Sequence, residues 1–260
     1  MEFKQYLEQQ KLSDYTIKTH INKIKLYKEK YGNIGYDLDF IISNIDKEPT
    51  ISMRKSLAGS LSKYIKYKGK DTKKMADYIF KQTADFQADK NKRTAETKHE
   101  LPTLKNIKAE LNILYERQDW RSFVILYLMT TYQVRNKDLI CLVVSSKRET
   151  NSNDNFIVVG KSQAVYIRND YKTAFKYGTK TNIIKNKKFM NAINQIGYVL
   201  KPTDNVDRVI KKATAGIGSI TEGTIAKIVL SEHNTMNGLK KVSKNRGTDP
   251  VTLIESYNIT

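Results

Sequence analysis

Apolar residues recur every three or four positions through most of the first 88 residues, the spacing of helices that bury one face. The segment 12–32 is typical: Ser13 or Asp14 can cap its start, and Gly32 can end it. Its apolar face comprises Ile17, Ile21, Ile24 and Tyr27. Further helices are predicted at 50–69 and about 71–88. The pattern predicts a small, all-helical unit.

The pattern breaks between residues 87 and 104, where apolar residues are few and charged residues are many. We interpret residues 93–102 as a linker, and the stretch just before them can still be helical. The chain is therefore expected to form two domains, at 1–92 and 103–260.

After the linker, helical patterns alternate with short strand patterns. The segments 155–160 and 163–171 alternate apolar with polar residues and carry β-branched side chains, and the Gly-Lys-Ser between them suggests a hairpin. Residues 181–186 can add a strand. Helices are predicted at 103–118, 119–134, 187–200 and around 205–213, 222–230 and 236–244. The expected fold class is mainly α with a small antiparallel β-sheet.

The charge of the chain narrows the range of partners that it can bind. Lys and Arg number 46 against 27 Asp and Glu, which gives a formal net charge of +19. Like charges repel in a compact state, so this excess does not help folding, but it attracts a polyanion, and nucleic acid is the leading candidate. The alternative is a generally basic chain with solvated faces.

Other features exclude some classes of protein. Cys141 is the only cysteine, which excludes intrachain disulfides and cysteine-rich zinc sites. The three histidines lie far apart, so no metal or other cofactor is expected. The longest apolar run, 123–129, is too short to span a bilayer, and the first ten residues hold no apolar signal core. We expect an intracellular protein that does not enter membranes.

Three side chains can carry chemistry on an anion. Arg135 follows an apolar helix, and Asp138 lies three residues later, where a helical turn brings the two together as a phosphate-binding fork. Lys172 enters a turn after a strand and can reach a phosphate or a leaving oxygen. Tyr257 can act as a nucleophile if positive charge or a base lies nearby. Taken singly, each also fits a plain surface or packing role.

Their order and surroundings resemble the tyrosine recombinases, the phage-type integrases, over essentially the whole chain. The start LSDYTIKTHINKI is similar to the family's helical core-binding domain, and TTYQVRNKDLICL is similar to its first motif. YKTAFKYG resembles its strand-turn lysine segment, and RGTDPVTLIESY its last motif. In that last motif a tyrosine follows nine residues after a His or Trp, and here Tyr257 follows nine after Thr248.

The resemblance implies a helical core-binding domain followed by a tyrosine-recombinase-like catalytic domain. It implies that Tyr257 attacks a DNA phosphodiester and forms a 3′-phosphotyrosyl link without metal or ATP. Arg135, supported by Asp138, would bind the phosphate, and Lys172 would be the general acid. The implied partner is double-stranded DNA, and the protein is expected to be a monomer that assembles on DNA.

Two motif positions depart from the family pattern. The family has a His-x-x-Arg pair some thirty residues before the tyrosine, and here Thr224 and Lys227 stand in that place, with Arg246 as a second candidate donor. The later His or Trp is replaced by Thr248. Three functions therefore stay open: a recombinase or integrase, a catalytically impaired DNA-binding or virion-associated protein with the same fold, and an unrelated basic helical protein with RNA or another acidic partner. Convergence of Arg135, Lys172, Lys227 and Tyr257 would favour the first two.

Overall fold

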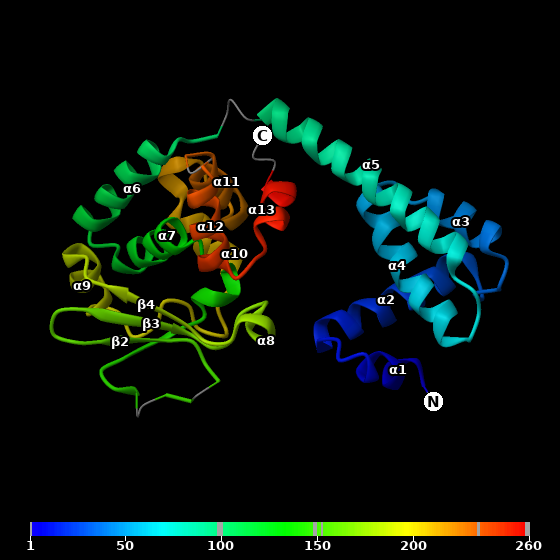
Figure 1. Ribbon diagram of the computed structural model, residues 1–260, viewed down its shortest axis with the longest axis horizontal. Coiled ribbons are helices and arrows are strands. Elements are labelled where there is room, and N and C mark those ends of the chain that lie inside the picture. The colour runs from blue at the N-terminus through cyan, green and yellow to red at the C-terminus, as the bar shows by residue number, and fades with distance from the viewer. Residues whose placement is uncertain (1, 98–100, 148–149, 152, 233–234, 258–260) are drawn as a thin grey trace. The chain divides into compact units, whose positions relative to one another are not determined.

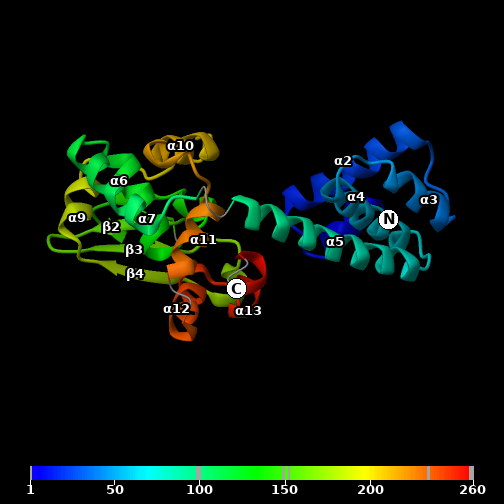
Figure 2. The ribbon, with the colours of Figure 1, turned by 90° about the horizontal axis from the view of Figure 1, so that it is seen from above.

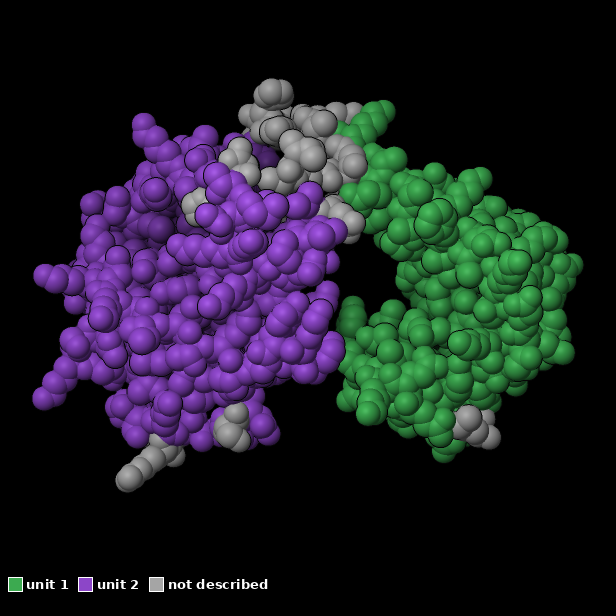
Figure 3. Space-filling model, viewed as in Figure 1, with its two compact units in different colours: residues 1–96 green, residues 97–260 purple. Residues whose placement is uncertain are grey.

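The computed structural model describes residues 2–97, 101–147, 150–151, 153–232 and 235–257. The chain divides into two compact units, residues 1–96 and 97–260 (Figure 3). Of the expected linker 93–102, residues 93–97 complete a long helix and residues 98–100 lie outside the described ranges. The roles expected of the two domains stay predictions.

The first unit is helical throughout its described length (Figure 1). Its helices are α1 (Phe3–Gln9), α2 (Asp14–Tyr31), α3 (Leu38–Asp46), α4 (Ile51–Tyr67) and α5 (Lys73–Thr97). The Ser13 hydroxyl accepts a hydrogen bond from the Thr16 N–H at the start of α2, and Gly32 ends the helix with a φ of 83°. Both helix ends confirm the sequence prediction. The core comprises Ile24, Tyr27, Ile41, Ile45, Leu57, Ala58, Leu61, Ile65 and Met75.

The second unit combines helices with a small sheet. Its first half contains α6 (Leu104–Glu116), α7 (Trp120–Tyr132), the 3₁₀ helix η2 (Asn136–Leu139), β1 (Leu142–Val144), β2 (Phe156–Val159) and β3 (Ala164–Arg168). Its second half contains α8 (Ala174–Tyr177), β4 (Lys180–Ile184), α9 (Lys187–Ile193), α10 (Val206–Ala213), η4 (Ala215–Ile217), α11 (Glu222–Glu232), α12 (Met236–Arg246) and α13 (Pro250–Tyr257).

Helix α7 is the centre of this unit. It packs against α6, α9, α10 and α11, and its apolar side chains are almost all buried, as its sequence predicts (Figures 1 and 2). Ile157 and Tyr166 from one face of the sheet join the α7 core. Phe156 and Ile167, their neighbours along the strands, form a separate cluster on the opposite face. The sheet therefore lies against the helices by one face.

The four strands follow the order β1-β2-β3-β4. The pairs β2–β3 and β3–β4 are antiparallel, and β1 pairs with β2 in parallel, so the sheet is mixed. The predicted hairpin and the mainly α fold class with a small sheet are confirmed, but the sheet was expected to be antiparallel throughout, and its β1–β2 pair is parallel. None of the helices within the described ranges is long and apolar enough to cross a membrane.

One predicted helix is shorter than expected. The segment 187–200 was expected to be helical throughout, but α9 ends at Ile193. Tyr198 and Leu200 form β-bridges with Leu142 and Ile140 instead. Backbone hydrogen bonds to the strand region therefore replace the last turns of the predicted helix.

Candidate functional site

The site begins where α7 ends. Gln133 ends that helix in the left-handed conformation, with a φ of 48°. The Asn245 side chain donates to Gln133 Oε1 at 3.2 Å, and Arg246 Nη1 donates to the Gln133 carbonyl at 2.9 Å. The end of α7 is therefore held against the end of α12, which lies more than a hundred residues later in the sequence.

Arg135 extends this contact to the loop between α12 and α13. Its Nη1 donates to the Arg246 carbonyl at 2.7 Å, and its Nη2 donates to the Thr248 hydroxyl. The fold thus brings the first expected motif to the residue that precedes Tyr257 by nine positions.

The start of α11 completes the arrangement. Glu222 Oε2 accepts from the Asn136 backbone N–H at 3.3 Å, and Glu222 Oε1 accepts from Arg246 Nη2 at 2.6 Å. Arg246 is only 2% exposed, so this second candidate donor lies inside the domain. We call Gln133, Arg135, Glu222, Arg246 and Thr248 the junction cluster, because they join three distant segments.

The other expected site residues are Lys172, Lys227 and Tyr257. Lys172 is exposed in the turn between β3 and α8. Lys227 is half-buried on α11, five residues after Glu222. Tyr257 is the last residue of α13, and its side chain lies outside the described residues. Convergence of Arg135 with Lys172, Lys227 and Tyr257 stays a prediction.

Asp138 has a buried partner that the sequence did not indicate. Its carboxylate forms an ion pair with Arg168 at 3.1 Å, and the two side chains are 0% and 1% exposed. The expected contact between Arg135 and Asp138 includes a hydrogen bond from the Arg135 backbone N–H, at 3.3 Å. Burial raises the pKa of Asp138, and the neighbouring Arg168 opposes that shift. The pair anchors η2, and with it the position of Arg135.

Sequence reasoning also missed the side chains that hold the α12–α13 loop. Thr173 donates to the Gly247 carbonyl at 2.6 Å, and Ser243 donates to the Thr248 carbonyl. Lys180 Nζ donates to the Lys244 carbonyl and lies 3.4 Å from the Asn245 carbonyl. The contacts of Thr173 and Lys180 join residues far apart in the sequence, so no local pattern predicts them.

The structure also offers a second candidate for the strand-turn lysine. The turn between β2 and β3 contains the exposed Lys161, whereas Lys172 follows β3. Since the resemblance expects a lysine in a strand turn, Lys161 is a second residue that meets this criterion. The Gly-Lys-Ser at 160–162, which predicts the hairpin turn, already placed a lysine in a strand turn.

Two features of the α12–α13 loop require a glycine at position 247. Its φ of 62° is in the left-handed region, and an added Cβ would lie 3.0 Å from Lys180 Nζ, Thr173 Oγ1 and Tyr171 Cε2. We expect Gly247→Ala to lower the free energy of unfolding of the second unit by at least about 1–2 kcal/mol. Chemical denaturation followed by circular dichroism measures this change.

Gly59→Ala is the matched control for Gly247→Ala. Gly59 lies inside α4, and an added Cβ there would meet nothing within 4 Å. This substitution should stabilise the first unit by about 0.5–1 kcal/mol, because alanine favours helix interiors over glycine. A Gly247→Ala protein as stable as the wild type would contradict the tight fit of the loop.

Comparisons with known proteins give one finding. No family model matches the chain, and no curated protein matches it. The crystal structure of XerA recombinase is similar to this chain with a TM-score of 0.38 and 13% sequence identity, over 98% of this chain and 91% of that chain.

Among the described residues, no group of three or more His, Cys, Asp and Glu side chains could hold a metal ion.

Proposed function

We propose that this protein binds double-stranded DNA and cleaves and rejoins its strands through Tyr257, as a site-specific recombinase or integrase. The observation that carries the proposal is the contact of Arg135 with the Thr248 hydroxyl and the Arg246 carbonyl at 2.7 Å. It joins two segments that the sequence suggested as parts of one site. Thr248 is two residues before α13, the helix that ends at Tyr257.

The proposed reaction exchanges one phosphodiester bond for another. The Tyr257 phenol gives up its proton to water as its oxygen bonds to phosphorus. The bond from phosphorus to the 5′ oxygen breaks, and that oxygen takes a proton and leaves as a hydroxyl. Arg135 would stabilise the charge on the non-bridging oxygens, and Lys227 would add a second positive charge. Lys172 would donate the proton, with Lys161 as a second candidate. The reverse attack by another strand's 5′ hydroxyl releases the tyrosine.

The experiment for this proposal is covalent trapping. A panel of nicked duplexes lets a short 5′-hydroxyl fragment diffuse away after cleavage, so rejoining fails. The wild-type protein should then migrate as a protein–DNA adduct on a denaturing gel. A wild-type protein without an adduct on any duplex would contradict the cleavage part of the proposal.

A second candidate function is DNA binding without efficient cleavage. Thr248 and the pair Thr224 and Lys227 stand where the family has other residues, and Arg135 donates to the chain's own Arg246 carbonyl. Losing one oxyanion donor typically costs about 10²–10³ in rate. This candidate predicts duplex binding with no adduct, so the trapping experiment separates it from the first.

Both candidates predict steeply salt-dependent binding. The net charge of +19 favours binding that releases counterions from DNA phosphates. If six to ten phosphates are contacted, the affinity for an arbitrary duplex should fall about 10³–10⁵-fold between 50 and 200 mM salt. Fluorescence anisotropy measures the affinity, and circular dichroism at both salt concentrations checks that the fold is unchanged. An affinity that salt does not weaken would point away from a nucleic acid partner.

A further inference from the structure

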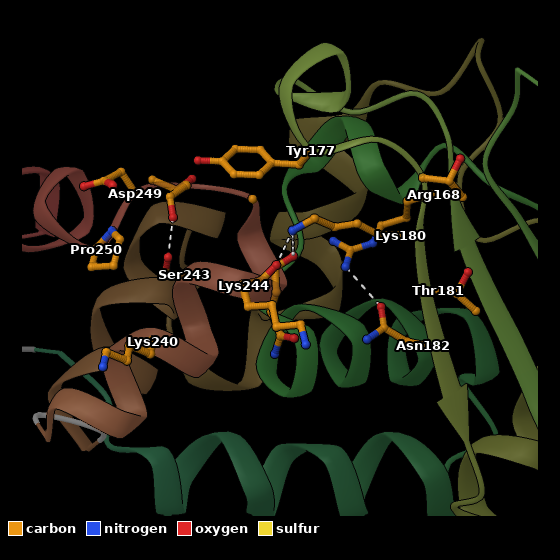
Figure 4. Close-up of a pocket in the computed structure, with 14 residues that line it drawn as sticks. Arg168, Tyr177, Lys180, Thr181, Asn182, Lys240, Ser243, Lys244, Asp249 and Pro250 are labelled. Carbon is orange, nitrogen blue, oxygen red and sulfur yellow. Dashed lines mark hydrogen bonds between the residues drawn. The ribbon is translucent and has the colours of Figure 1, made fainter.

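The second unit contains a pocket of about 570 Å³ between β4 and the end of α12 (Figure 4). Arg168 and Lys180 line it from the sheet, and Lys240 and Lys244 line it from α12. Asp249 is the one acidic side chain in this lining. Hydroxyl and amide side chains make up most of the rest. Cationic and neutral polar residues therefore make up most of the lining, and positive charge is in excess.

The sheet itself places two of these cations together. Arg168 on β3 is the direct partner of Lys180 on β4 in the antiparallel register. Side chains at such positions lie about 4.5–5.5 Å apart at Cβ, and like charges there repel. Asp138 balances the charge of Arg168 at 3.1 Å. Lys180 contacts the backbone carbonyls of the α12 end instead, as the dashed lines in Figure 4 show.

Carbonyls at a helix end carry only a partial negative charge, so they balance an ammonium incompletely. Burial, and then the charge of Arg168, lower the pKa of Lys180 to about 8. The charged groups that act on Lys180 are Arg168, Asp138, Arg135 and Lys244. An anion in the pocket would offset this repulsion, and the surroundings of Lys180 therefore favour an anionic ligand.

We propose that this pocket binds a phosphate group, with the Lys180 ammonium as the main hydrogen-bond donor. A phosphate fits better than a carboxylate, because its several oxygens can accept from the cations and the hydroxyl groups together. The phosphate can belong to a nucleic acid backbone or be free in solution. The pocket shares Thr248 with the junction cluster. Binding of a phosphate there requires no cleavage chemistry at Tyr257, so the two proposals are tested separately.

Lys180→Gln tests the proposal, and Lys185→Gln is the matched control. Lys185 is an exposed lysine just after β4 and is not part of the pocket lining. Isothermal titration calorimetry would use two ligands, inorganic phosphate and a short DNA duplex, with the full chain. Lys180→Gln should weaken at least one of them about tenfold, the loss expected for one charge-assisted hydrogen bond. Lys185→Gln should stay close to the wild type.

The two ligands identify the source of the phosphate. A selective loss of duplex binding assigns the site to the nucleic acid backbone, and a selective loss of inorganic phosphate binding assigns it to a free phosphate. Equal affinities of both variants for both ligands would overturn the proposal. Neither result depends on adduct formation, so failure here and failure of strand cleavage are separate outcomes.

Two measurements guard against a folding defect in Lys180→Gln. Lys180→Arg keeps the charge and should keep most of the affinity. In the wild-type protein, titration with each ligand followed by amide NMR should shift Thr181, Asn182, Lys244 and Asn245, which line the pocket. If neither ligand shifts these amides, the proposal is wrong whatever the variants do.

Discussion

Tyr257→Phe should abolish the covalent protein–DNA adduct on nicked duplexes and leave duplex affinity unchanged. The substitution removes only the phenolic oxygen, which is the atom that would bond to phosphorus. Binding should persist because it depends on the many lysines and arginines of the chain rather than on one hydroxyl. Denaturing gels measure the adduct, and fluorescence anisotropy measures the affinity.

The control for Tyr257→Phe is another tyrosine of the same unit. Tyr198 is 39% exposed, and Tyr198→Phe removes the same group, a phenolic hydroxyl. It should form the adduct at the wild-type rate. If Tyr257→Phe still forms an adduct, the nucleophile is a different residue. If it loses duplex affinity as strongly as adduct formation, the tyrosine serves binding rather than cleavage.

Asp138→Ala should lower the free energy of unfolding of the second unit by about 3–5 kcal/mol, the usual cost of leaving a buried charge unpaired. Arg168 would keep its positive charge at 1% exposure and lose its partner at 3.1 Å. The Arg135 backbone N–H would also lose its acceptor. Denaturant unfolding of the second unit measures the change.

Two comparisons make this prediction specific. The double variant Asp138→Leu with Arg168→Met replaces the buried pair by apolar side chains and should recover most of the lost stability. Asp170→Ala breaks the Lys137–Asp170 pair, whose side chains are 54% and 56% exposed, and should cost at most about 1 kcal/mol. If Asp138→Ala and Asp170→Ala cost the same, the Asp138–Arg168 pair does not hold η2 in place.

Most helices were predictable because their signals are local. Ser13 and Gly32 bound α2 through their own backbone preferences, and the apolar spacing between them gives the buried face. The α9 prediction failed at residues 194–200 because a partner strand segment far away in sequence takes their hydrogen bonds. Local propensity carries no information about such a partner.

In the candidate site, too, some residues have local sequence signals and others are brought in only by the tertiary fold. Arg135 was a candidate from the sequence alone, since it follows an apolar helix and Asp138 lies three residues later. Arg168 and Lys180 were not, because the alternation of a strand predicts which face a residue occupies but not which residue lies opposite. Their pairing follows from the β3–β4 register, and the bond between Lys180 and the Lys244 carbonyl follows from the packing of α12 on the sheet.

The loop held by Arg135, Thr173 and Lys180 also fixes where α13 starts. An α-helix turns by about 100° and advances about 1.5 Å with each residue. From Pro250 to Tyr257 the chain therefore rises about 10 Å, and the angular phase of the last side chain depends on the residue count between them. One residue added to or removed from this stretch would swing the phenol about a quarter of a circle around the helix axis. The proposed role of Tyr257 therefore requires a fixed number of residues between the loop and the phenol, more than it requires particular exposed side chains between them.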